Sequence, residues 1–175
     1  MDPEKAAKGN SSITGRRFGK ATRFLLRLPA HLYDWHAGWL LGNRFVRLTH
    51  VGRKSGRRYE TMLEVIGTDR ATGELVVMAG FGRSSDWFRN IQAGPAVEIA
   101  INGRRFPPRH RILDQNQAAA ALTDYERRNR LIAPIVRRVL CRLAGSPYDG
   151  SAAARLRLIR QLPMIGFRPL SDSDR

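Results

Sequence analysis

Between residues 44 and 113, apolar and polar side chains alternate in short segments that are separated by turns. The segments are residues 44–51, 58–67, 73–79, 96–101 and 104–113. A period of two is typical of half-buried strands, and tight turns between consecutive strands indicate antiparallel pairing. Asn102-Gly103 predicts a type I′ hairpin turn between the last two segments. Pro107-Pro108 then interrupts the second hairpin arm and indicates an edge or a bulge.

Helical periodicity lies on both sides of these strands. Residues 16–42 predict amphipathic N-terminal helices, residues 87–93 a short helix, and residues 114–161 a helical region. Asp114 is the expected N-cap of this region, with Gln117 placed for a capping box. Pro134 interrupts it and predicts two helices or a kink.

These elements predict an α+β protein with a mainly β core. Residues 1–15 are polar and charged and are expected to be a disordered tail. Residues 16–175 are expected to form one domain, in which residues 44–113 supply the barrel strands and residues 164–170 a last strand. About six mostly antiparallel strands would leave exposed edges, which favours a closed or nearly closed barrel with flanking helices.

The net charge of +16 requires either an acidic partner or a compositional explanation. Of the 31 basic residues 27 are Arg, which a GC-rich genome would also produce. Nonspecific nucleic-acid binding therefore remains an alternative, although no helix-turn-helix, zinc finger or RNP pattern is present and no specific nucleic acid is expected.

Other chemistries have little support in the residues. The single Cys141 excludes an internal disulfide, and the four His residues have no metal-ligand spacing, so no metal is expected. No GxSxG elbow accompanies Ser84-Ser85. Without a signal peptide or an apolar run of about 20 residues, the sequence predicts a cytoplasmic protein, with membrane attachment through its basic, aromatic N-terminal helices as an alternative.

The first turn between strands has the composition of an anion site. Gly52-Arg53-Lys54-Ser55-Gly56 follows a strand directly. Glycines permit a nest of backbone N–H groups, and the two cations supply charge-assisted donors. A hairpin turn with solvated charges is the alternative reading.

This stretch and the residues after it resemble one known family. Leu48-Thr49, the GRKSG turn, Thr61, Ala79-Gly80, Trp87-Phe88, Asn90-Ile91 and Pro95 together look like the deazaflavin-dependent nitroreductases, a branch of the flavin/deazaflavin oxidoreductases. The similarity covers about residues 48–101. This chain differs in having Gly80 where Ser is common, Asp86 where Pro is usual and Tyr59 where a further Arg is frequent.

The resemblance implies a split β-barrel that binds coenzyme F-420 and transfers hydride between the reduced deazaflavin and an activated alkene, quinone or nitro acceptor. It implies two groups of cofactor-binding residues. The tail would meet Arg53, Lys54, Ser55, Arg57 and Arg58, and the ring would lie beside Ala79, Gly80, Phe81, Gly82, Trp87 and Asn90. Tyr125 is the expected proton donor, and Tyr33, Trp35 and Trp39 are expected to line a substrate pocket.

Two further expectations complete this hypothesis. The partner would be a small electron-poor molecule, and a homodimer is compatible with the residues but not required by them. The rival hypothesis keeps the barrel as a noncatalytic module that binds FMN, haem or a lipid at a membrane surface.

Overall fold

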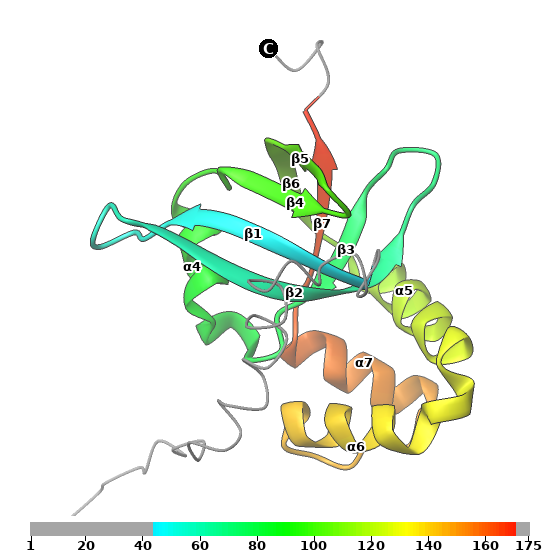
Figure 1. The fold of residues 1–175 in the computed structure, drawn as a ribbon. Coiled ribbons are helices and arrows are strands. Elements are labelled where there is room, and N and C mark those ends of the chain that lie inside the picture. Colours follow the sequence, from blue (N-terminus) through cyan, green and yellow to red (C-terminus); the bar gives the residue numbers. More distant parts are fainter. Residues whose placement is uncertain (1–43, 171–175) are drawn as a thin grey trace, which may run out of the picture.

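The computed structural model describes residues 44–170 (Figure 1). The expected tail, the N-terminal helices and the substrate-pocket residues Tyr33, Trp35 and Trp39 lie outside this range. Within it, one antiparallel sheet of seven strands carries helices at one end and on one face (Figure 1). The α+β fold with a barrel-like β core and flanking helices is therefore confirmed.

The strands follow one another along the sheet in the order β5-β4-β1-β2-β3-β7-β6. Their bounds are β1 Phe45–Val51, β2 Arg58–Thr68, β3 Leu75–Met78, β4 Glu98–Ile101, β5 Arg104–Phe106, β6 Pro108–Ile112 and β7 Met164–Pro169. β1 and β2 form the longest ladder, with Leu48 opposite Thr61 and His50 opposite Tyr59. The antiparallel pairing of the first three strands is as predicted.

The expected second hairpin arm, residues 104–113, is not one strand. Pro107 divides it into β5, which pairs with β4, and β6, which pairs with β7. Proline has no N–H to donate, so it ends one ladder and lets the chain turn into another. Because β5 and β6 are the two edges of the sheet, a single residue joins the edges covalently, and the sheet becomes a nearly closed barrel. The expected six strands become seven for this reason.

The helices form two groups. α4 (Asp86–Ala93) follows the one-turn η2 (Gly82–Ser84) beside the β1–β2 turn, while α5 (Gln115–Arg128), η3 (Arg130–Ile132), α6 (Ala133–Ala144) and α7 (Ala152–Gln161) lie together at the other end (Figure 1). Asp114 and Gln117 form the predicted capping box of α5. Pro134 lies in the first turn of α6, where its missing N–H costs nothing. The interrupted pattern therefore gives separate helices.

Two apolar cores occupy the two faces of the sheet. Inside the barrel, Val46 and Leu48 of β1 are fully buried against Trp87, Phe88 and Ile91 of α4. On the outer face, α5, α6 and α7 enclose a second core whose buried members include Leu122, Leu140 and Leu158. The barrel core fixes α4, and the second core fixes the other three helices.

An ion pair between the half-exposed Arg111 and the buried Glu74 fastens the closing strand β6. Arg111 donates from Nε and Nη2 to the two carboxylate oxygens of Glu74, at 2.8 and 2.7 Å, and from Nη1 to Gln117 at 2.6 Å. The Glu74 side chain is 7% exposed. A Cβ at position 166 would lie 2.5 Å from the Glu74 carboxylate, so only glycine leaves room for this pair.

We expect Gly166→Ala to lower the free energy of unfolding by about 2 to 4 kcal/mol, because the methyl group displaces a buried carboxylate from its partner. Urea denaturation measures the change. Gly94→Ala is the matched control, since Gly94 has extended backbone and nothing lies within 4 Å of a Cβ there. Equal stability of the two variants would contradict this role of Gly166.

Candidate functional site

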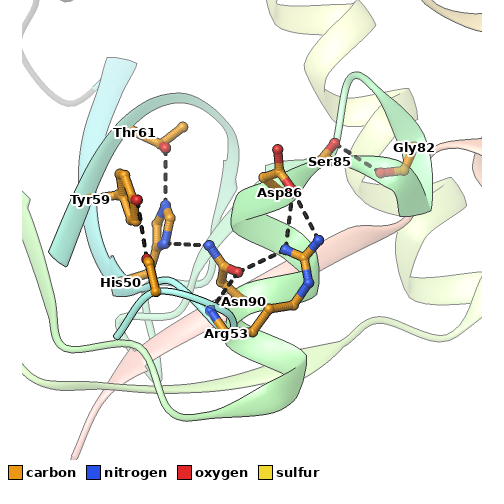
Figure 2. A network of polar contacts seen from close by, with 9 residues as sticks. His50, Arg53, Tyr59, Thr61, Gly82, Ser85, Asp86 and Asn90 are labelled. Atoms are coloured by element: carbon orange, nitrogen blue, oxygen red, sulfur yellow. Dashed lines mark hydrogen bonds and ion pairs between the residues drawn. The ribbon is translucent and has the colours of Figure 1, made fainter. Parts of the chain in front are cut away.

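A buried polar chain links the barrel to the basic turn (Figure 2). His50 on β1 lies 3.2 Å from the Thr61 hydroxyl through Nε2 and 3.1 Å from the Asn90 amide nitrogen through Nδ1. Asn90 Oδ1 accepts from the Arg53 backbone N–H at 3.1 Å and from Arg53 Nη1 at 2.9 Å. Arg53 also donates from Nη1 and Nη2 to Asp86 Oδ1, each at 3.1 Å.

The direction of these hydrogen bonds fixes the state of His50. The Asn90 amide nitrogen can only donate, so Nδ1 of His50 must accept, and the ring proton lies on Nε2 and points to Thr61. His50 and Asn90 are 4% and 6% exposed. Burial lowers the pKa of His50, and the Asp86 carboxylate opposes this to a smaller extent. The neutral imidazole therefore orients Asn90, and Asn90 orients Arg53.

The turn between β1 and β2 is held by its own backbone. Gly52 donates to the Arg57 carbonyl at 2.8 Å, and Ser55 and Gly56 donate to the Gly52 carbonyl at 3.2 and 2.8 Å. The Arg53 N–H binds Asn90, so four of the five N–H groups of the turn have acceptors within the protein. The expected backbone nest is therefore wrong for these four groups, and side chains supply most of the donors that remain for an anion.

Side chains explain why this turn needs Gly52. A Cβ there would lie 2.6 Å from Ser55 Oγ and 2.6 Å from the Tyr59 ring. The Tyr59 hydroxyl lies 3.2 Å from Ser55 Oγ, and its ring stacks on His50 at 6.0 Å between centroids. Tyr59 thus covers the turn from the β2 side.

The cations of the turn differ in their partners. The Arg53 side chain is 24% exposed and paired with Asp86, whose side chain is 84% exposed. Lys54, Arg57 and Arg58 are exposed and have no acidic partner in the described part of the chain. The turn therefore presents three unpaired cations around one fixed guanidinium, and Asp86 is the single opposing charge that contacts it.

The loop that was expected to lie along a ring packs on other elements. The Ala79 N–H donates to the Pro163 carbonyl at 2.9 Å, and a Cβ on Gly80 would contact Leu143 of α6 at 3.5 Å. Gly82 has φ +65°, and a Cβ there would lie 2.9 Å from the Gln161 carbonyl. Phe81 remains 45% exposed. The backbone conformation and the close carbonyl thus explain why position 82 is glycine without any ligand. The loop leads directly into α4.

Trp87 and Tyr125 lie away from the polar chain. Trp87 is 8% exposed and packs edge-on against Phe88 in the barrel core. The Tyr125 hydroxyl donates to Glu64 at 2.9 Å on the outer face of β2, the face opposite Thr61. Burial and, to a lesser extent, Glu64 raise the pKa of Tyr125 to about 12. The structure therefore brings Arg53 and Asn90 together and leaves Tyr125 on the other side of the sheet.

The polar chain contains residues that the sequence pattern did not assign to the site. His50 and Asp86 were not among the residues expected to bind the cofactor. The available signal was the alternation itself, since His50 and Thr61 fall at inward positions of neighbouring strands. Buried polar side chains at such positions require partners.

The fold and the site define a nearly closed antiparallel β-barrel with a basic turn at one end. The model of one family, the F-420H(2)-dependent quinone reductases, matches residues 25–134. This match spans more than half of the chain, which therefore belongs to that family. The protein is a deazaflavin-dependent oxidoreductase, and the resemblance drawn from the sequence is confirmed.

Solved structures with a similar fold are more distant. A structure of an F-420-H2 dependent reductase (FDR-A) is 19% identical, with 73% of this chain and 96% of that chain covered and a TM-score of 0.42. An FMN binding protein related to pyridoxamine 5'-phosphate oxidase, from Nostoc punctiforme, is 18% identical, with 82% and 80% covered and a TM-score of 0.40. A search of curated proteins found no match.

We expect the stability of the protein to fall as the pH drops below 6.5, the ordinary pKa of His50. The unfolded chain then binds a proton that the buried imidazole resists, so the free energy of unfolding decreases until the pH passes the lower folded-state pKa. Urea midpoints between pH 7 and 5 measure this loss, which should be smaller in His50→Gln.

His110→Gln is the control, because burial also lowers the pKa of His110, which lies away from the polar chain. Both histidine variants should flatten the pH dependence, but His50→Gln alone should also disturb the hydrogen bonds between Asn90 and Arg53, since it changes the group that orients Asn90. A profile of His50→Gln that matches that of the unmodified protein would contradict the assignment of a neutral, buried His50.

Proposed function

We propose that Arg53, Lys54, Ser55, Arg57 and Arg58 hold the anionic tail of coenzyme F-420, and that the enzyme reduces an electron-poor acceptor of the quinone class. The observation that carries the proposal is the fixed Arg53 guanidinium surrounded by exposed cations without acidic partners. Phosphate and carboxylate groups of a coenzyme tail are the ligands that such guanidinium and ammonium groups bind best. The donor set thus fits the coenzyme of the family.

The ring half of the site is proposed from Ala79, Gly80, Phe81, Gly82, Trp87 and Asn90. This segment leads into the helix that carries Asn90, so the two halves adjoin through α4. Asn90 uses its oxygen for Arg53 and its nitrogen for His50, which makes it a positioning residue for the tail site. Trp87 supports α4 from the barrel core, and Phe81 is 45% exposed where η2 begins.

The chemistry divides between cofactor and chain. When bound, the deazaflavin supplies the hydride. The chain binds the tail and orients the cations through the His50–Asn90 link. Tyr125 is the proton donor that the resemblance implies, and its raised pKa keeps the hydroxyl protonated at neutral pH. This hydroxyl donates to Glu64 on the outer face of β2, across the sheet from the polar chain, so the geometry does not support that role.

We expect saturable quenching of coenzyme F-420 fluorescence by the purified protein, and at least about tenfold weaker binding in Arg53→Ala/Lys54→Ala. The loss follows from two charge-assisted contacts, each worth about 1.5 to 3 kcal/mol. The matched control is Arg157→Ala/Arg160→Ala, which removes the same charge from exposed positions of α7. Equal weakening in both variants would show that coenzyme affinity depends on net charge alone, and it would contradict a specific site at the turn.

We expect Asp86→Asn to raise the affinity for coenzyme F-420 in the same titration. Asp86 competes with an incoming anion for Arg53, so its neutralisation should tighten binding. FMN in a parallel titration tests the rival module. Binding of FMN without coenzyme F-420 would reject the cofactor assignment for this chain.

A second proposal concerns the outer face of η3 and α6, and the occupant we propose is an anionic membrane surface. Leu131, Ile135 and Val139 are 91%, 63% and 48% exposed. Arg138 and Arg142 are exposed on the same face. Apolar residues flanked by arginines suit the boundary between headgroups and acyl chains. No helix among residues 44–170 is long and apolar enough to cross a bilayer.

We expect Leu131→Ser/Ile135→Ser to lower cosedimentation with phosphatidylglycerol vesicles at least about threefold, because the apolar contact area is lost. Ile112→Ser/Val51→Ser is the control, with two exposed apolar side chains on strands. Unchanged cosedimentation of the α6 variant would reject attachment through this face.

A further inference from the structure

A second concentration of positive charge lies far from the basic turn. A cavity of about 280 Å³ opens among the helices of the outer core. Its walls come from α5, η3, α6 and α7, and its lining residues are Thr123, Glu126, Arg127, Arg130, Ala133, Val136, Arg137 and Arg155. In Figure 1, these helices and the β1–β2 turn lie at opposite ends of the molecule. None of the residues assigned to coenzyme binding lines the cavity.

The one carboxylate among the lining residues of the cavity, that of Glu126, already has a partner at each oxygen. Glu126 is 16% exposed at its side chain and accepts from Arg155 Nε at 2.7 Å through Oε2. Its other oxygen accepts from the Tyr148 hydroxyl at 2.6 Å. The Glu126 carboxylate raises the pKa of Tyr148, although burial is the larger cause. Glu126 therefore fixes Arg155 in the wall and makes no ion pair with the other three arginines.

Those three arginines differ in how they are compensated. Arg127 pairs with Asp124, which is not a lining residue, at 3.0 Å on the surface. Arg130 and Arg137 have no acceptor anywhere in residues 44–170. Two unpaired guanidinium groups facing one cavity raise its positive potential, and an anion placed between them would relieve their repulsion.

The form of the cavity suits a phosphate-bearing ligand. Guanidinium groups bind phosphate oxygens through two parallel hydrogen bonds, and groups from different helices can approach several oxygens of one anion. The Thr123 hydroxyl lies in the same wall, although it donates to the Ala119 carbonyl at 2.8 Å and is left only as an acceptor. Ala133 and Val136 give the remaining wall an apolar surface. The volume is at the lower limit of ligand pockets, which favours a compact polyanion.

We propose that this cavity is an anion-binding site for a phosphate or diphosphate group, held by Arg130 and Arg137 with Arg155 as a fixed third donor. The site is separate from the coenzyme site and contributes nothing to the hydride transfer itself. The phosphate group can belong to a soluble metabolite or to a phospholipid headgroup, since both present the same oxygens.

The experiment uses the full chain and inorganic pyrophosphate as the probe, titrated by calorimetry at constant ionic strength with chloride as the reference anion. We expect one saturable site, and at least a tenfold loss of affinity in Arg130→Gln/Arg137→Gln. The matched control is Arg157→Gln/Arg160→Gln, which removes the same charge from exposed positions of α7, outside the cavity. All four side chains are exposed, so the variants should fold, and circular dichroism checks this.

Three further measurements separate the explanations. Affinity for pyrophosphate should be unchanged in Arg53→Ala/Lys54→Ala and in the presence of saturating coenzyme F-420. Displacement of pyrophosphate by the coenzyme would overturn the claim of a separate site.

Vesicles with and without phosphatidic acid distinguish the two sources of the phosphate group. Retention on vesicles that requires phosphatidic acid, Arg130 and Arg137 assigns the site to a lipid headgroup. Binding of pyrophosphate without such retention assigns it to a soluble ligand. The proposal would be overturned if neither pyrophosphate nor the vesicles bound, or if the control variant lost as much affinity as Arg130→Gln/Arg137→Gln.

Discussion

The candidate coenzyme site depends on the buried side-chain amide of Asn90, which donates a hydrogen bond through its nitrogen and accepts through its oxygen. Asn90 is 6% exposed, and its nitrogen and oxygen must both find partners in an apolar barrel. The nitrogen binds a histidine that burial keeps neutral, and the oxygen binds both the backbone and the side chain of Arg53. A helix, a strand and a turn are thereby fixed relative to one another. An arginine held in this way meets an anion with less loss of side-chain entropy than a freely moving one.

The net charge of +16 is better understood by asking which basic side chains have an acidic partner in the described part of the chain. Some arginines fasten the fold, as Arg111 does with the buried Glu74, and these are not available to ligands. Others have no acidic partner in the described part of the chain, and some of these lie around the β1–β2 turn or line the cavity between the helices. The presence or absence of an acidic partner therefore decides whether an arginine fastens the fold or leaves its charge uncompensated.

Much of the fold followed from local patterns. The strand period, the Asn102-Gly103 turn and the Asp114 capping box all act between residues close in the sequence, and the structure has each of them. The glycine-bracketed turn was also recognisable, and it lies where two long strands meet. Which of its groups are free to donate hydrogen bonds was not predictable, because the Arg53 N–H binds Asn90, 37 residues further along the chain.

What the sequence determined by itself was the set of elements, their antiparallel order, the basic turn and, through combined motifs, the family. What only the tertiary structure decided was how distant elements meet. Pro107 stops a strand locally, but which strands its two halves join depends on closure of the whole sheet. The placing of His50 against Asn90, of Asp86 against Arg53, and of Tyr125 on the outer face of β2 depends on packing. Side chains far apart in the chain become partners only when a core fixes the elements that carry them, and no local pattern records that geometry.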